Sequence, residues 1–175
     1  MSYSDWAPAV NDLQARTSGI TLPQGELAEA IGLKLSNEPT VVAIALIEAF
    51  LRPALYGTSA PLATPKQSAF LASLGHEPDS FDMPRSVASA WIDHYLSVRT
   101  LKSLRELQPK AGDLLKHSKD FVDPTTGEVE TVETDVVVSS IGSSGRVYFK
   151  GGNSYSGWPT DLSRDVSPHP VFIGQ

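Results

Sequence analysis

The sequence pattern changes near Pro109, and this change constrains the fold more than any other feature. Before it, apolar residues recur at the three- and four-residue spacing of helices. Beyond it, glycines, serines and β-branched residues dominate, as in short strands joined by turns. A chain of 175 residues is long enough for two small domains. The sequence therefore predicts an α+β protein, with a helical domain over 1–109, a small domain over 110–165 and a flexible tail over 166–175.

Caps and prolines delimit about five helices in the first domain. The predicted ranges are 5–15, 26–35, 39–51, 65–74 and 84–107. Ser36 is the expected cap of the third helix, and Pro53 is expected to end it. That helix is apolar nearly all round, which predicts burial at the centre of the core. Thr64 and Gln67 have the spacing of a capping box, which predicts the start of the fourth helix.

Short strands are predicted in the second domain. Val132–Ile141 is β-branched, and a glycine turn joins it to Arg146–Lys150. Alternation within the second strand places Val147 and Phe149 on one face and Tyr148 on the other. Four or five short strands in about 55 residues must close on themselves to hide their edges. We therefore expect a small C-terminal β-barrel.

Composition excludes several classes of protein. The chain has no cysteine, which removes disulfides and thiolate metal sites and suits a cytoplasmic protein. No apolar run reaches the roughly 18 residues of a membrane span, and the first residues do not resemble a secretion signal. The net charge is −6, divided as −2 over 1–110 and −4 over 111–175, so bulk charge does not indicate a strongly basic nucleic-acid-binding domain.

No catalytic or cofactor motif is present. The sequence lacks a Gly-x-Ser-x-Gly elbow, a phosphate-binding Gly-Lys-Ser/Thr loop and a dinucleotide-binding glycine motif. The four histidines (His76, His94, His117 and His169) have no metal-ligand spacing, and each is expected to be structural. Carboxylates such as Asp82 and Asp93 form no recognisable constellation. We expect no enzyme activity, no cofactor and no metal.

An acidic run marks the expected hairpin of the second domain. It contains no basic residue and consists of Asp120, Asp123, Glu128, Glu130, Glu133 and Asp135. Carboxylates at this spacing could hold calcium or magnesium, but the alternating ligands of an EF-hand loop are missing. The plainer interpretation is a solvated hairpin that protects an edge strand and repels phosphate.

A basic stretch lies where the two domains meet. Residues 85–119 carry a net charge of +4, and Arg99, Lys102 and Arg105 recur every three residues along the predicted helix. Such a row can contact successive backbone phosphates of a nucleic acid. The alternative is a solubilising surface, favoured by cations near a helix C-terminus.

Aromatic and basic residues come together in the second domain. If Val147 and Phe149 fill the barrel, the outward residues are Arg146, Tyr148 and Lys150, with Tyr155 and Trp158 on the glycine-rich loop that follows. Aromatic faces among cations can stack bases, clamp a methylated amine or anchor a peptide. The alternative for Trp158 is a core position that closes the barrel end. Tyr155 is the stronger candidate for a ligand contact.

A segment of the first domain resembles a known helical module. Ala63–Gly75 carries Thr-Pro-Lys-Gln and a Leu-Gly stop, and Ala88-Ser89 with Ile92 follow. Residues 63–96 thus resemble a short appendage of bacterial and phage proteins that handle nucleic acids. The resemblance implies a helical hairpin over 63–108 and carries no catalytic residues. Met83 departs from the family pattern, in which a capping hydroxyl begins the second helix.

The second domain resembles a Tudor/KOW-like small barrel. The resemblance rests on Gly112-Asp113 at the start of a strand, on Gly145–Phe149 and on Trp158-Pro159 before the last turn. Such barrels usually bind nucleic acid, peptide tails or protein partners. The resemblance therefore implies a binding module, and the fold alone does not choose among these ligands.

These features lead to two hypotheses about function. The first is a non-enzymatic binding module of a bacterial or phage nucleic-acid-handling system, with DNA or RNA held by the basic helix end and the aromatic barrel face. In this hypothesis the helical domain docks a protein partner or dimerises. The alternative is a protein–protein adaptor or inhibitor that does not bind nucleic acid. The sequence leaves the oligomeric state and the kind of nucleic acid open.

Overall fold

The computed structural model describes residues 7–35, 37–76, 82–151 and 155–164. The predicted cap Ser36 and the predicted tail over 166–175 lie outside these residues. Contacts divide the described chain into two compact units. A helical unit comprises 11–101, and a sheet unit comprises 102–164 together with 7–10.

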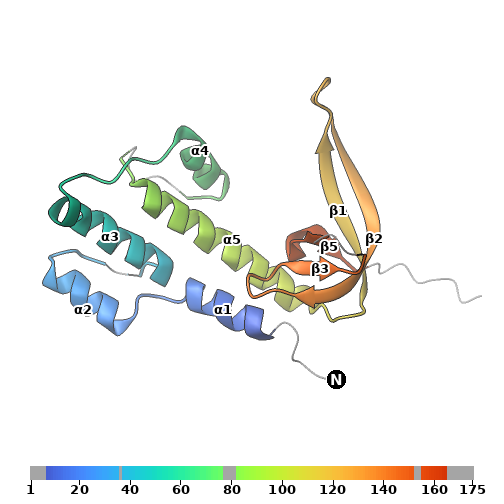
Figure 1. Cartoon of the computed structure of the whole chain (residues 1–175), viewed down its shortest axis with the longest axis horizontal. Coiled ribbons are helices and arrows are strands. Elements are labelled where there is room, and N and C mark those ends of the chain that lie inside the picture. Colours follow the sequence, from blue (N-terminus) through green and yellow to red (C-terminus); the bar gives the residue numbers. More distant parts are fainter. Residues whose placement is uncertain (1–6, 36, 77–81, 152–154, 165–175) are drawn as a thin grey trace, which may run out of the picture. The chain divides into compact units, whose positions relative to one another are not determined.

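The helices and strands occupy separate parts of the chain, with the helices first, which confirms the predicted α+β class (Figure 1). The helices are α1 (Ala7–Thr17), α2 (Leu22–Ala30), α3 (Thr40–Tyr56), α4 (Pro65–Ser73) and α5 (Arg85–Leu107). Among the described residues, none of them combines the length and the apolarity needed to cross a membrane. The residues of α5 from Lys102 onward belong to the sheet unit.

Capping boxes begin two of these helices. The Gln67 amide donates to Thr64 Oγ1 at 3.2 Å, and the Thr64 amide donates to Gln67 Oε1 at 3.0 Å, which confirms the predicted start of α4. The same pair of residue types occurs at Thr21 and Gln24, where the Thr21 amide donates to Gln24 Oε1 at 2.9 Å. This second box begins α2 at Leu22, four residues before the predicted start.

Helix α3 differs from its prediction in two ways. Pro53 lies inside the helix, which ends instead at Gly57 in the left-handed conformation. A proline in the last turn removes one hydrogen bond, whereas a left-handed glycine stops the helix. In addition, α3 is not buried all round: Val42 is fully buried, but Ile44 and Phe50 are half exposed. The helix therefore contributes one face to a core cluster, through Val42 and Ala45, and does not lie at the centre of the core as predicted.

The strands form one antiparallel sheet in the order β4-β3-β2-β1-β5. Their bounds are β1 (Leu114–Val122), β2 (Val129–Ile141), β3 (Val147–Phe149), β4 (Ser156–Gly157) and β5 (Leu162–Ser163), with a 3-10 turn, η1 (Pro159–Asp161), between the last two. The core of the unit consists of Leu115, Val136, Val138, Val147, Phe149 and Leu162. Val147 and Phe149 are buried and Tyr148 is exposed, as the alternation predicts.

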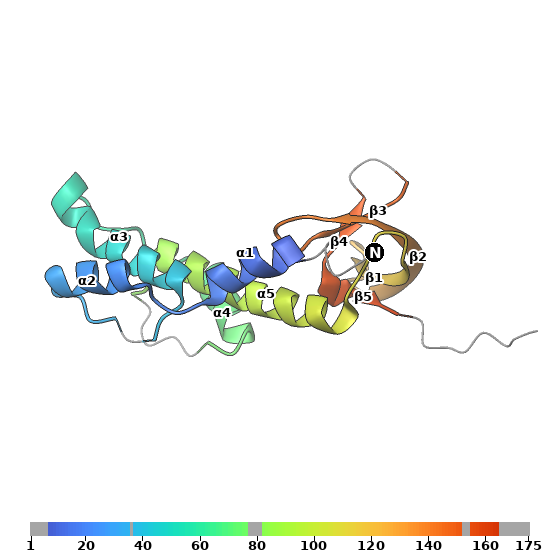
Figure 2. The same ribbon diagram turned by 90° about the horizontal axis from the view of Figure 1, so that it is seen from below.

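The sheet is strongly curved (Figure 2). Its two edge strands, β4 and β5, are joined by residues 158–161 alone. Across a flat sheet of five strands the edges would lie about 19 Å apart, but five extended residue steps reach only about 17 Å, and a 3-10 turn shortens them further. Among the described residues no pairing joins β4 to β5, so the sheet stays open and the predicted barrel closure is not confirmed.

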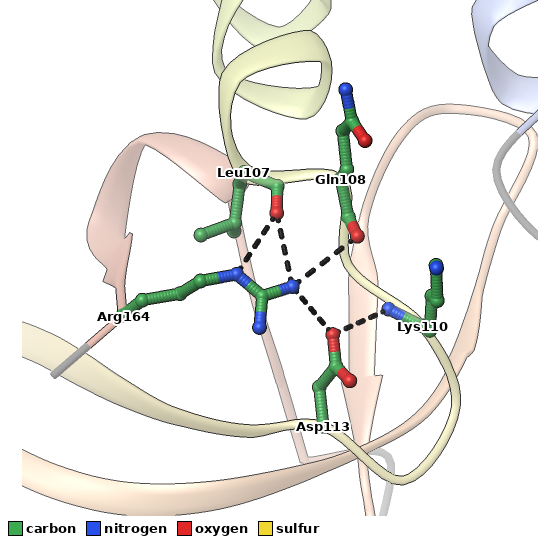
Figure 3. Close-up of polar contacts among 5 residues, drawn as sticks. All are labelled: Leu107, Gln108, Lys110, Asp113 and Arg164. Atoms are coloured by element: carbon green, nitrogen blue, oxygen red, sulfur yellow. Dashed lines mark hydrogen bonds and ion pairs between the residues drawn. The ribbon is translucent and has the colours of Figure 1, made fainter. Parts of the chain in front are cut away.

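Arg164 fastens the end of the sheet to the end of α5 (Figure 3). Its Nη2 lies 2.6 Å from Asp113 Oδ2 and donates to the carbonyl oxygens of Leu107 and Gln108 at 3.1 and 3.3 Å. Asp113 Oδ2 also accepts from the Lys110 amide at 3.0 Å. The guanidinium thus satisfies carbonyls that a helix C-terminus leaves without partners.

Candidate ligand-binding groove

A groove of about 670 Å³ opens on the sheet unit. Its lining includes residues 117–120 of β1 and residues 155–158. Arg146, Thr160 and Asp161 complete the lining. All of these residues belong to one compact unit.

The groove lies where β1 leaves the core of the sheet. Strand β1 pairs with β5 only at Lys116 and His117, although it pairs with β2 along its whole length. From Ser118 onward the β5 side of β1 therefore has no strand partner among the described residues. The groove lies along this edge of β1, next to the short strand β4.

Two partly exposed aromatic rings line the groove. Tyr155 is 43% exposed and Trp158 is 41% exposed. Trp158 therefore does not occupy a core position, which was the alternative that the sequence left open. The Arg146 guanidinium lies 5.5 Å from the centre of the Trp158 ring, a cation–π distance. Tyr155 packs edge-on against Phe149 with ring centres 5.1 Å apart, which fixes its orientation.

His117 is the buried polar residue of the groove. It is 7% exposed, packs on Phe149 and lies with Nδ1 3.5 Å from the Tyr155 hydroxyl. Burial lowers the pKa of His117; the Asp161 carboxylate opposes this shift and the Lys119 ammonium adds to it. The ring is therefore held in its neutral form at pH 7.

Gly157 makes room for that ring. A Cβ atom at this position would lie 2.8 Å from His117 Nε2 and 3.2 Å from Phe149 Cζ, so any side chain would displace the histidine. Sequence reasoning missed both residues of this contact. The available signal was the alternation that places His117 on the same buried face as Leu115.

The groove contains as many carboxylates as cations. Lys119 and Arg146 oppose Asp120 and Asp161. Thr131 donates from its hydroxyl to Asp120 Oδ1 at 2.7 Å, and the Thr160 hydroxyl donates to Asp161 Oδ1 at 2.9 Å. Each carboxylate is thus oriented by a threonine on one of its oxygens.

The structure brings together three of the predicted site residues. Arg146, Tyr155 and Trp158 line the groove, whereas Tyr148 and Lys150 are exposed but do not line it. Tyr148 lies instead against the turn after β2, where a Cβ atom on Gly142 would be 3.1 Å from the tyrosine ring.

The basic row occupies exposed positions on α5. Arg99, Lys102 and Arg105 are all exposed, and none of them lines the groove. Lys102 Nζ lies 4.0 Å from Glu106 Oε1, one helical turn away, in an exposed pair. Such pairs contribute little to stability, so the lysine remains available to other anions.

The acidic hairpin shows no metal site. Among the described residues no group of three or more histidine or carboxylate side chains could hold a metal ion. The Asp123 carboxylate instead accepts hydrogen bonds from the amides of Thr125 and Thr126, and these bonds lower its pKa. Asp123 therefore shapes the tight turn between β1 and β2.

An aromatic cluster in the helical unit was not predicted. His76 Nδ1 lies 3.1 Å from the Tyr95 hydroxyl, and Trp91 stacks on Tyr95 at 5.7 Å between ring centres. His94 contacts both rings of α5, and burial lowers its pKa. These contacts pack the end of α4 against α5.

No protein-family model, curated protein or solved structure matches this chain.

Proposed function

We propose that the protein is a non-enzymatic nucleic-acid-binding module whose groove holds an unpaired segment of DNA or RNA. The observation that carries this proposal is the convergence of Tyr155, Trp158, Arg146 and Lys119 on one groove. Partly exposed rings beside cations are the elements with which proteins stack bases and contact the backbone of single strands.

The partners of the two cations support this assignment. Among the described residues no carboxylate lies within ion-pair distance of Arg146 or Lys119; Arg146 lies over Trp158, and Lys119 lies 4.9 Å from the Phe121 ring centre. Their charges are therefore available to phosphate oxygens. The acidic hairpin beyond them disfavours phosphate. A bound strand would therefore follow the groove and not the hairpin.

Two further parts of the molecule fit the same proposal. We propose that the curved sheet is a small barrel similar to Tudor/KOW domains, and that residues 63–96 are the helical appendage of bacterial or phage nucleic-acid-handling proteins. In this view Thr64 and Gln67 are structural caps. Arg99, Lys102 and Arg105 would add non-specific phosphate contacts.

The test is fluorescence anisotropy with labelled single-stranded DNA, double-stranded DNA and single-stranded RNA. Trp158→Ala is expected to weaken single-strand binding about fivefold or more, because stacking contributes roughly 1–3 kcal/mol per base. Tyr148→Ala is the matched control, since it removes an exposed ring that does not line the groove. The proposal is wrong if neither single-stranded probe binds, or if both variants bind like the unaltered protein.

A second candidate function is a protein–protein adaptor. It is favoured by apolar side chains of the helical unit that remain at least half exposed: Ile44, Phe50, Leu55 and Tyr56. Exposed apolar surface of this kind often marks a protein interface. Salt separates the two functions, because phosphate binding weakens steeply as salt rises whereas an apolar interface responds little.

A further inference from the structure

Phosphate binding alone does not explain why the groove contains two carboxylates. Asp120 and Asp161 line the same groove as Tyr155 and Trp158. A carboxylate beside a phosphate is repulsive, so these two groups disfavour passage of the backbone along their side of the groove. When a strand is bound, its bases suit this side of the groove better than its phosphates do.

Each carboxylate keeps hydrogen-bonding capacity. Threonine hydroxyls occupy only Oδ1 of Asp120 and Oδ1 of Asp161. Within the described part of the chain, Oδ2 of each has no hydrogen-bond donor. An ionised carboxylate only accepts hydrogen bonds, so the ligand atoms that suit these positions are N–H donors.

A third polar group faces the same space. His117 lines the groove, is more than nine-tenths buried and has no hydrogen-bond partner for Nε2 among the described residues. Among the described residues, the fully buried side-chain atoms without a partner are Arg52 Nε and His94 Nδ1, so His117 Nε2 keeps some exposure and can form a hydrogen bond with a ligand or water. The rings thus lie beside a polar set formed by Asp120, Asp161 and His117 instead of an apolar wall.

The edges of the bases differ in a way that this set can distinguish. Cytosine and adenine each present an exocyclic amino group, and guanine presents one beside its ring N–H. Uracil and thymine present a carbonyl oxygen where cytosine and adenine have the amino group, and their one ring N–H lies between two carbonyl oxygens. A carboxylate accepts from an amino group and repels a carbonyl oxygen.

We propose that the groove selects unpaired bases that carry an amino group over uracil and thymine, with Asp161 and Asp120 as the specificity-determining residues. The inference rests on the proposed nucleic-acid binding and adds the chemical class of base that is held. Tyr155 and Trp158 provide stacking that any base can use, and the carboxylates provide the discrimination.

The experiment compares oligo-dC with oligo-dU of equal length by fluorescence anisotropy at neutral pH and one fixed salt concentration. These pyrimidines differ in an amino group against a carbonyl. Oligo-dC is expected to bind about fivefold or more tightly, the lower end of the discrimination that a hydrogen-bonded base contact gives. In Asp161→Asn the affinity for oligo-dU is expected to rise, because the negative charge that repels its carbonyl oxygens is lost, and the dC to dU ratio is expected to fall toward one.

The ratio of oligo-dC affinity to oligo-dU affinity distinguishes base recognition from a general electrostatic effect of removing a carboxylate. Glu130→Gln removes an exposed carboxylate that does not line the groove, and it is expected to leave the ratio unchanged. Asp120→Asn is the second groove variant, and it too is expected to lower the ratio. Both aspartates are exposed, so their amides should leave the fold intact.

The outcomes distinguish this inference from the function on which it rests. Equal binding of oligo-dC and oligo-dU that still depends on Trp158 overturns the selection of amino-bearing bases but leaves nucleic-acid binding in place. A dC to dU ratio that is unchanged in both Asp161→Asn and Asp120→Asn also overturns the selection of amino-bearing bases and leaves nucleic-acid binding in place. If no oligonucleotide binds in a manner that depends on Trp158, the proposed function and this inference are both wrong.

Discussion

The two halves of the β1–β2 hairpin share one pairing register but have opposite environments. The inner half, with Leu115 opposite Val136, is buried in the core of the sheet unit. The outer half, with Val122 opposite Val129, is exposed on both faces and extends beyond the other strands (Figure 1). Both halves contain β-branched residues. The difference is that β5 pairs with the inner part of β1 and β3 with the inner end of β2, whereas within the described ranges no further strand pairs with the outer half.

This difference shows why the groove lies where it does. A strand that passes from a packed core into solvent must change its partners at some residue, and in β1 that residue is His117. Just before it, side chains stabilise the fold; just after it, Ser118, Lys119 and Asp120 line a groove. The candidate site is therefore the boundary between the two halves.

The largest expected effect is loss of the inner core. Leu115→Ala should destabilise the sheet unit by about 2–5 kcal/mol, because it opens a cavity among fully buried residues. Val122→Ala, at a position 63% exposed on the same strand, should change stability by less than about 0.5 kcal/mol. Hydrogen exchange of the β2 amides measures the stability change of the sheet unit in each variant. Similar losses of stability in the two variants would show that the outer half of the hairpin is packed like the inner half.

Part of this arrangement could be predicted from sequence, because it depends on local rules. Thr64 and Gln67 identify a helix start by their spacing, and the faces of β3 follow from alternation. Three of the five residues predicted for the aromatic face, Arg146, Tyr155 and Trp158, do line the groove. These inferences required no knowledge of distant contacts.

The rest depends on long-range pairing. The return of β5 to β1 brings Leu162 opposite His117, and nothing near either residue encodes that partnership. Gly157 resembled a loop glycine because the histidine it accommodates is forty residues away in the sequence. The error at Pro53 had a local cause: the left-handed stop at Gly57 was available in the sequence but was given less weight than the proline.

The boundary itself can be tested at Gly157. Gly157→Ala should destabilise the sheet unit by about 1–3 kcal/mol, since the added methyl overlaps the His117 ring. Gly25→Ala is the control: its Cβ meets no atom within 4 Å, and α2 should become slightly more stable. Urea denaturation followed by hydrogen exchange measures the stability of the sheet unit and of the helical unit separately. A neutral Gly157→Ala would mean that the histidine ring is free to move away.

A smaller effect is expected from pH, and it concerns the same histidine. Burial holds the pKa of His117 below its ordinary value of 6.5, so the unfolded chain binds this proton more readily than the folded one. The stability of the sheet unit should therefore be highest above pH 6.5 and fall as the pH decreases below it. The slope contributed by one group cannot exceed about 1.4 kcal/mol per pH unit.

His117→Gln isolates this contribution, because glutamine keeps a polar group beside the Tyr155 hydroxyl but does not titrate. The variant should lose the part of the pH dependence that lies just below 6.5, while the carboxylates continue to titrate at lower pH. Burial also lowers the pKa of His94, but that residue lies in the helical unit, so exchange of the β2 amides excludes it. An unchanged slope in His117→Gln would show that His117 accepts a proton without cost. The histidine would then be solvated like the outer half of the hairpin and would no longer mark the boundary with the core.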